Sequence, residues 1–234
     1  MAKRICAVLG VGPGNGAALA RRFAAGGYDI ALLSRSQEKL DMFARQLDVG
    51  AQTFPCDARD PDSMAAAFSS LRESMGPVDV LCYNAGSGSW ATPENTTVDD
   101  MENAFRINAT GLLSAAHQVV PDMHKKGGGA IMITGATASL RGGARTTAFA
   151  AAKAAQRSLA QSLAKDLGPR GIHVALFIID GVIDLPRTRK MLPDKPDTFF
   201  LKPDEIADTI YHVARQPKSA WTFEMDLRPF SEKW

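Results

Sequence analysis

Hydrophobic residues gather in short runs along the chain, and longer segments with the period of an α-helix separate these runs. Most runs are apolar almost throughout, as in central strands of a parallel sheet that helices cover on both faces. The runs predict seven strands, at Ile5–Leu9, Asp29–Leu33, Ala51–Cys56, Val78–Tyr83, Ala130–Thr134, His173–Ile179 and Trp221–Leu227. The segments between them predict helices over Ala17–Ala25, Gln37–Leu47, Pro61–Met75, Ala144–Leu167, Pro203–Gln216 and within Thr97–Lys126.

This alternation of strands and helices predicts an α/β fold. Right-handed crossovers would order the strands into one doubly wound, Rossmann-type parallel sheet of about seven strands. No linker, repeat or low-complexity tract divides the chain, so we expect residues 1–234 to form a single domain. Asp60 before Pro61 predicts a helix start, and Gly168 before Pro169 predicts that the preceding helix ends at a C-terminal glycine.

Composition and charge narrow the classes of function. Of the 234 residues, 45% are hydrophobic and 22% are charged, with a formal net charge of +2 and no basic run longer than two. Nucleic acid is therefore not an expected partner. The three cysteines show no metal-binding spacing, so we expect no metal site and a reducing, cytoplasmic location. No apolar run approaches the about 18 residues that a membrane span needs, so no membrane partner is expected.

The first predicted strand leads directly into a turn that contains Gly10, Gly12, Gly14 and Gly16, and a helix follows. Glycines let the backbone approach a diphosphate closely, and the helix N-terminus favours negative charge. A glycine-rich loop without a ligand is the alternative. The position directly after the first strand favours a dinucleotide site, and the glycine spacing resembles that of the short-chain dehydrogenase/reductase family.

Further motifs resemble the same family in the same order, so the chain is identified as a member of it. Asp57 follows the third strand, where the resemblance implies a contact with adenine, although a loop cap is the alternative. Asn84-Ala85-Gly86 resembles the signature after the fourth strand, with Tyr83 in place of its first asparagine. The implied cofactor site comprises Gly10, Gly12, Gly14, Asn15, Gly16, Ser34, Arg35, Asp57, Asn84, Ala85, Gly86, Lys153 and Ile183.

The end of the second strand bears on the choice of cofactor. Family members that prefer NAD usually carry an acidic residue there, whereas this chain has Ser34-Arg35-Ser36. A guanidinium and hydroxyl groups could bind a 2′-phosphate, which favours NADP(H) over NAD(H), although NAD(H) is still possible. The alternative is that Arg35 is a solvated surface cation.

Only part of the family's catalytic pattern is present. The resemblance implies that Asn108 holds a water in a proton relay and that Lys153 binds the nicotinamide ribose. Phe149 stands four residues before Lys153, where most members have the proton-donating tyrosine. Ala136, thirteen residues before Phe149, stands where they have the serine that bonds the substrate oxygen. The chain is therefore an atypical member without the two hydroxyl groups expected at the reacting oxygen.

Substitute groups are available near these positions. Asp180, after the sixth strand, and Ser139, just past the missing serine, are speculative proton donors; both are also ordinary loop residues. Arg141 and Arg145 precede the Ala-rich helix and could bind an anionic substrate, or could be solvated. Leu185 stands where a phosphate-binding threonine is common in the family.

Two functions therefore stay open. The first is an NADP(H)-dependent oxidoreductase that acts on an unidentified small carbonyl, alcohol or activated alkene with a nonstandard proton donor. The second is a dinucleotide-binding protein that has lost turnover and acts as a sensor or partner subunit. The resemblance also implies a homodimer or homotetramer that pairs through the helix of Ala144–Leu167, and a substrate lid over Pro186–Phe200.

Overall fold

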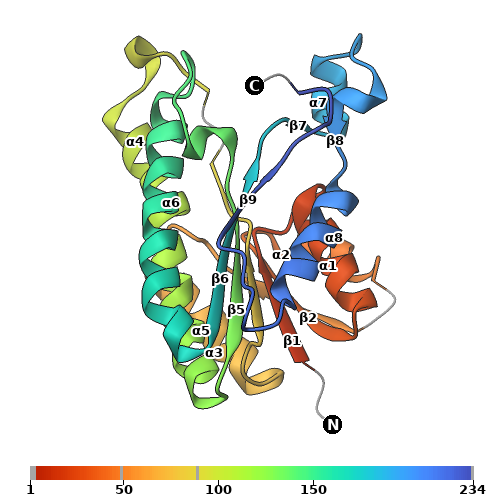
Figure 1. Cartoon of the computed structure of the whole chain (residues 1–234), viewed down its shortest axis with the longest axis vertical. Coiled ribbons are helices and arrows are strands. Elements are labelled where there is room, and N and C mark those ends of the chain that lie inside the picture. Colours follow the sequence, from red (N-terminus) through yellow and green to blue (C-terminus); the bar gives the residue numbers. More distant parts are fainter. Residues whose placement is uncertain (1–3, 48–49, 88–89, 233–234) are drawn as a thin grey trace.

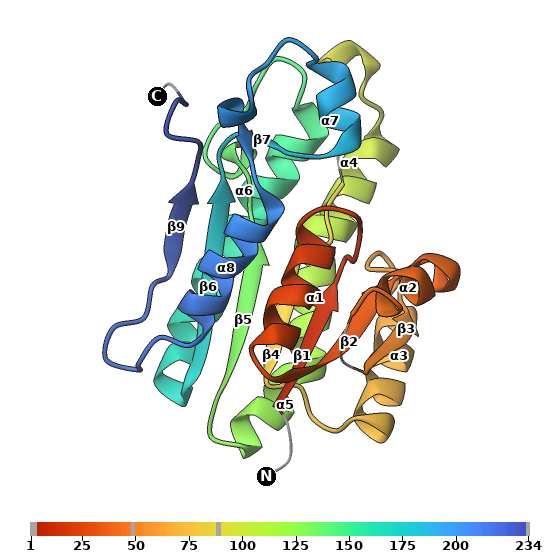
Figure 2. The same ribbon diagram turned by 90° about the vertical axis from the view of Figure 1, so that its right-hand side faces the viewer.

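A seven-stranded parallel sheet forms the centre of the computed structural model, which describes residues 4–47, 50–87 and 90–232 (Figure 1). Its strand order is β3-β2-β1-β4-β5-β6-β9, the doubly wound arrangement that the sequence predicts. The strands are β1 (Arg4–Leu9), β2 (Tyr28–Ser34), β3 (Ala51–Pro55), β4 (Val80–Tyr83), β5 (Gly129–Thr134), β6 (Ile172–Ile179) and β9 (Glu224–Leu227). All of them point toward the same edge, where α7 lies (Figure 2).

Helices cover both faces of this sheet, as Figures 1 and 2 show. One face carries α1 (Asn15–Ala25), α2 (Gln37–Ala44) and α8 (Pro203–Ala214). The other carries α3 (Pro61–Ser74), α5 (Gly111–Lys125) and α6 (Thr147–Leu167), with α4 (Val98–Phe105) beside α6. None of the helices in the described part of the chain is both long and apolar enough to cross a membrane.

Two-sided burial explains why the central strands are apolar throughout instead of alternating, whereas the edge strands β3 and β9 contain exposed polar residues. In β1, Cys6 and Val8 pack toward α1 and α8, whereas Ile5, Ala7 and Leu9 pack toward α3 and α5. Each residue of β6 is buried in the same way. A polar residue on either face would lose its hydration, so neither face can carry the polar half of an alternating pattern.

Two helix boundaries were predicted from the residues beside a proline. The start at Asp60-Pro61 is confirmed, and the role of Gly168 at the end of α6 needs correction. At α3 the Asp60 carboxylate accepts a hydrogen bond from the Asp62 amide at 2.9 Å, and Pro61 occupies the first turn. The helix α6 does end at Leu167, but Gly168 keeps a helical φ of −54°. Because proline suits a tight turn, a 3₁₀ turn (Gly168–Arg170) follows, and Gly171 with φ +82° reverses the chain.

The long helical stretch from residue 97 to 126 is interrupted by five residues of π-helix, Arg106–Thr110. At this point the Tyr83 hydroxyl donates a hydrogen bond to the Ile107 carbonyl oxygen. Gly111 allows the close approach, because a Cβ there would lie 2.6 Å from the Tyr83 hydroxyl oxygen. The wider turn places Asn108 in the interior, where its side chain is fully buried.

The segment after β6 lies over the carboxyl edge of the sheet. Two short paired strands, β7 (Val182–Ile183) and β8 (Phe200–Leu201), precede and follow α7 (Pro186–Met191) in the sequence. Figure 2 shows α7 above the sheet. Short 3₁₀ turns occur at Pro93–Asn95, Thr137–Ser139 and Asp197–Phe199. The last strand of the sheet begins at Glu224 and not at Trp221 as expected, because Trp221 stacks on the His173 ring with centroids 4.6 Å apart.

We predict that Gly10→Ala strongly destabilises the protein. Gly10 has φ +95°, and a Cβ there would lie 2.4 Å from the backbone nitrogen of Ala85. Left-handed strain together with a backbone collision should lower the free energy of unfolding by at least about 2 kcal/mol in urea denaturation. Gly12→Ala is the matched control, because no atom lies within 4 Å of its Cβ position, and it should cost less than about 1 kcal/mol. Equal costs for the two variants would contradict this account.

Candidate active site

Three adjoining cavities follow the carboxyl edge of the sheet. The first, of about 250 Å³, lies beyond β1, β2 and β3 and includes Ser34, Arg35 and Asp57 in its lining. The second, of about 550 Å³, covers the glycine turn, and the third, of about 580 Å³, extends to Lys153. Asn84 and Gly86 border all three. The three cavities therefore form one continuous groove.

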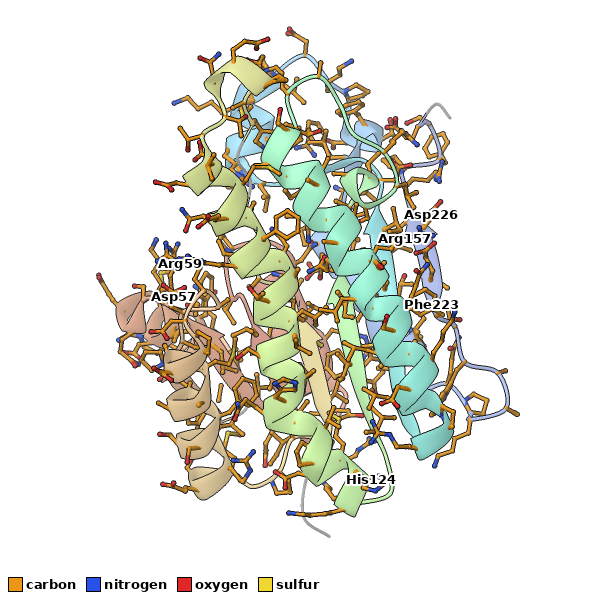
Figure 3. The ribbon with its side chains drawn as sticks, turned by 90° about the vertical axis from the view of Figure 1, so that its left-hand side faces the viewer. Asp57, Arg59, His124, Arg157, Phe223 and Asp226 are labelled. Atoms are coloured by element: carbon orange, nitrogen blue, oxygen red, sulfur yellow. The ribbon has the colours of Figure 1, made fainter. Side chains whose placement is uncertain are left out.

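An arginine that the sequence analysis did not single out also lines the first cavity. Arg59 Nη2 donates to the Asp57 carboxylate at 2.6 Å, and its Nε lies 3.1 Å from the same carboxylate (Figure 3). These hydrogen bonds hold the pKa of Asp57 below its usual range. The carboxylate expected to contact adenine is therefore already paired, and Arg35 and Arg59 both border the cavity. In the sequence, the position of Arg59 two residues after Asp57 was the feature from which this ion pair could have been predicted.

The glycine turn packs against the end of β4 and leaves an open groove above it. Asn84 Nδ2 donates to the Gly10 carbonyl oxygen at 2.8 Å, which ties the two elements together. Asn15 borders this groove, and its buried Oδ1 has no hydrogen-bond partner among the described residues. Leu185 lies over the turn, since its Cδ2 would be 2.7 Å from a Cβ on Gly14. The groove thus has a glycine floor under an apolar cover.

Lys153 lies buried on α6 at the far end of the groove. Its Nζ donates to the Thr134 carbonyl oxygen at 2.8 Å and to Gln156 Oε1 at 2.9 Å. Gln156, itself fully buried, donates from Nε2 to the Asn108 carbonyl oxygen at 3.0 Å. Burial without a nearby carboxylate lowers the pKa of Lys153 to about 7. The bridging role of Gln156 was not foreseen from the sequence.

Asn108 lies in the interior on the π-helical turn, close to Gly86 and on the same side as Lys153 Nζ. Its Nδ2 donates to the Ala104 carbonyl oxygen at 2.9 Å and to Ser87 Oγ at 3.1 Å. Its buried Oδ1 has no hydrogen-bond partner in the described part of the chain. A Cβ on Gly86 would lie 3.4 Å from this Oδ1 and 3.6 Å from Lys153 Nζ. The absence of a side chain at Gly86 therefore keeps a small polar space open between the two groups.

Phe149 and Ala136 both line the third cavity beside Lys153. The Phe149 ring centroid lies 6.0 Å from Lys153 Nζ and 5.7 Å from the ring centroid of Trp90. Neither Phe149 nor Ala136 carries a side-chain proton donor. The two positions at which the family has a catalytic tyrosine and serine therefore do line the cavity. Here Phe149 and Ala136 give that part of the lining an apolar surface.

The two speculative proton donors lie in other surroundings. Asp180 is buried, accepts a hydrogen bond from Thr137 Oγ1 at 2.6 Å and pairs with Arg228 at 3.4 Å. Ser139 Oγ accepts a hydrogen bond from the Ala136 amide at 3.2 Å within a 3₁₀ turn. Neither residue borders the third cavity. Their contacts are those of an ion pair and a turn, and they do not favour either as the proton donor.

The groove as a whole fits an extended dinucleotide. Glycines admit a diphosphate at the middle, and guanidinium groups border one end. Ile183 borders both the second and the third cavity and reaches the end where Lys153 lies.

Comparisons with known proteins agree with this geometry. Residues 4–195 match the model of a family described as short chain dehydrogenase, so the chain belongs to the short-chain dehydrogenase family. An uncharacterized oxidoreductase of Staphylococcus aureus (strain USA300) is 26% identical over 227 residues, which cover 97% of each chain. A short-chain dehydrogenase structure from Rhodopseudomonas palustris is 33% identical, with a TM-score of 0.82 over 97% of this chain and 99% of that one.

Structural likeness extends to more distant proteins. L-sorbose reductase from Gluconobacter frateurii, in a complex with NADPH and L-sorbose, has a TM-score of 0.88 at 22% identity over 98% of this chain and 96% of that one. An alcohol dehydrogenase from Thermococcus sibiricus, complexed with 5-hydroxy-NADP, has a TM-score of 0.87 at 24% identity and covers 99% of this chain and 98% of that one. At these identities the likeness concerns the fold.

The buried ammonium of Lys153 predicts a specific dependence of stability on pH. With a folded pKa of about 7 and an unfolded value of 10.5, the unfolded chain binds more protons between these pH values. The free energy of unfolding should therefore rise with pH in this window, and Lys153→Met should remove that rise. Denaturation at several pH values measures it, with Lys165→Met at an exposed position of α6 as the control. An unchanged pH dependence in Lys153→Met would contradict the burial argument.

Proposed function

We propose that the protein is an NADP(H)-dependent oxidoreductase that acts on a small carbonyl, its alcohol or an activated alkene. The observation that carries this proposal is the continuous groove from Arg35, past the glycine turn, to Lys153. A bound nicotinamide dinucleotide supplies or accepts a hydride. The chain itself has to hold that cofactor, orient a carbonyl beside Lys153 and supply a proton.

The proposed cofactor contacts follow the groove. The adenosine end would lie against Ser34, Arg35 and the Asp57–Arg59 pair, and the diphosphate above the glycine turn near Asn15. The nicotinamide end would lie near Ile183 and Lys153. The complete set is Gly10, Gly12, Gly14, Asn15, Gly16, Ser34, Arg35, Asp57, Asn84, Ala85, Gly86, Lys153 and Ile183, to which we add Arg59.

A preference for NADP(H) is supported by charge at the adenosine end. Arg35 borders the first cavity, Arg59 offsets the charge of Asp57 in the same lining, and β2 ends in Ser34 without an acidic residue. A guanidinium forms paired hydrogen bonds with a phosphate, whereas a carboxylate would repel it. The L-sorbose reductase and Thermococcus sibiricus structures, and a metagenomic short-chain oxidoreductase in complex with NADP, contain such cofactors. Binding of NAD(H) is possible as a weaker alternative.

We propose that Lys153 Nζ is the source of the proton. An ammonium has three N–H groups, and two of them donate to Thr134 and Gln156. The third can serve the substrate oxygen, directly or through a water held at Asn108 Oδ1. A pKa of about 7 suits a general acid at neutral pH. Lys153 and Asn108 are thus the proposed catalytic residues, and Phe149 and Ala136 shape the space around the carbonyl.

The second candidate function is dinucleotide binding without turnover, in a sensor or a partner subunit. The absence of a side-chain hydroxyl at both Phe149 and Ala136 favours it, because a positioned general acid contributes about 10²–10⁴ in rate. The third cavity, which extends beyond the cofactor groove, favours the enzyme.

We further propose a single-domain, cytoplasmic protein that assembles as a homodimer or homotetramer through α6. Three buried free cysteines, Cys6, Cys56 and Cys82, support the reducing location. Six alanines among residues 148–155 of α6 support the assembly, because small side chains allow two helices to approach closely.

We predict that NADPH binds more tightly than NADH and that Arg35→Ser removes most of the difference. Hydrogen bonds to a charged group contribute about 1.5–3 kcal/mol, so the Kd of NADPH should rise about 10- to 100-fold while that of NADH stays constant. Calorimetric titration measures both constants. Arg45→Ser, at an exposed position after α2, is the control. Failure of the wild type to bind either cofactor would overturn the proposed function.

We predict that Ala136→Ser combined with Phe149→Tyr increases the rate of ketone reduction. The two hydroxyl groups would face the cavity beside Lys153, and a positioned acid should raise the rate by up to about 10⁴-fold. NADPH oxidation at saturating ketone measures it, with each single variant as a control. Wild-type turnover that Lys153→Ala abolishes supports the enzyme. No turnover in the wild type or the double variant, despite NADPH binding, favours the sensor.

A further inference from the structure

We infer that the substrate carries an anionic group, such as a carboxylate, and that Arg141 binds it. This inference rests on the proposed function and names the class of substrate for the same site. It is drawn from the charge of the third cavity, from the pairing of the nearby acids and from the positions of the two arginines that border it.

The charged residues that border the third cavity are all cations. They are Arg141, Arg187 and Lys153, of which the two arginines stay charged at neutral pH while Lys153, with a pKa of about 7, is only partly protonated; no described residue in the lining is Asp or Glu. Arg141 and Arg187 have no acidic partner in the described part of the chain. A cavity lined by one sign of charge raises the local concentration of ligands of the opposite sign.

The acids adjacent to the cavity lining in the sequence are neutralised by other residues. Asp180 pairs with Arg228 and accepts a hydrogen bond from Thr137. Asp184 accepts hydrogen bonds from Arg189 Nε and Nη2 at 2.7 and 2.8 Å, and Lys202 adds an ion pair at 3.5 Å. Since these carboxylates have their own counter-ions, they do not compensate the cations that border the cavity.

The positions of the two arginines assign them different ligands. Arg187 also borders the cavity over the glycine turn, so with a cofactor bound it lies near the diphosphate. Arg141 does not border that cavity; it lies at the substrate end, between the Thr137–Ser139 turn and Gly142-Gly143. Arg141 and Arg145 are both exposed, and they differ in that only Arg141 lines the third cavity. The sequence analysis named Arg141 and Arg145 together as possible ligands of an anionic substrate, and in the structure only Arg141 lines the cavity.

The remaining wall of the cavity suits an apolar body. Trp90 and Phe149 form a tilted aromatic pair with centroids 5.7 Å apart and an interplanar angle of 37°. Trp90 stays 62% exposed, although apolar side chains of this size usually pack against something. A carbonyl compound with an apolar or aromatic body and an anionic end would contact this wall, Lys153 and Arg141 together.

A matched acid and ester test this inference. Phenylglyoxylate and methyl phenylglyoxylate have the same activated ketone and aromatic ring, and they differ in the charge of one group. Their Kd values for the NADP⁺-loaded protein can be measured through quenching of Trp90 fluorescence, with Trp90→Phe identifying the signal. We expect the acid to bind at least about tenfold more tightly at low salt, as a charge-assisted contact provides. Added salt should reduce the difference.

Variants at the two neighbouring arginines provide the control. Arg141→Gln should bring the two Kd values close to equality, Arg141→Glu should favour the ester, and Arg145→Gln should keep the wild-type preference. The Kd of NADPH for each variant reports whether the groove still folds.

The outcomes separate this inference from the proposed function. Equal Kd values for acid and ester in the NADP⁺-loaded wild type, no measurable binding of the acid, or an equal loss in Arg145→Gln would overturn this inference alone. A wild type that binds neither cofactor would overturn the proposed function and this inference with it.

Discussion

The close approach of the turn after β1 to the end of β4 is the constraint on which the rest of the structure depends. Gly10 has no side chain, so its backbone packs directly against Ala85, and Asn84 Nδ2 bonds its carbonyl oxygen. This contact fixes the two central strand ends and leaves the groove above them open. The glycine turn, the cavity beyond β2 and the cavity beside Lys153 all meet at this point.

A second set of contacts determines the chemistry available in that groove. Lys153, Gln156 and the carbonyl oxygen of Asn108 form a chain of hydrogen bonds inside the protein. Its low-dielectric surroundings lower the lysine pKa because no carboxylate stabilises the ammonium. A lysine that titrates near neutral pH can exchange its proton without a phenol beside it. In the proposed function this lysine supplies the proton that neither Phe149 nor Ala136 can donate.

Positive charge borders the groove at both of its ends. Near β6 and α7, Asp180 and Asp184 pair with Arg228, Arg189 and Lys202. Arginines border the groove at the adenosine end, near the glycine turn and at the substrate end. An anionic cofactor and an anionic substrate would then be attracted by the same field.

The sequence by itself determined the fold and the location of the groove. Short apolar runs without alternation, bounded by turn residues, favour strands buried on both faces, and the glycines after β1 and the asparagine after β4 mark adjoining strand ends. These signals are local, because burial and backbone conformation act on consecutive residues. The tertiary structure decided which side chains meet across the chain. The Gln156 bridge, the Asp180–Arg228 pair and the separation of Arg141 from Arg145 depend on rotamers and on contacts between distant elements, which no local pattern encodes.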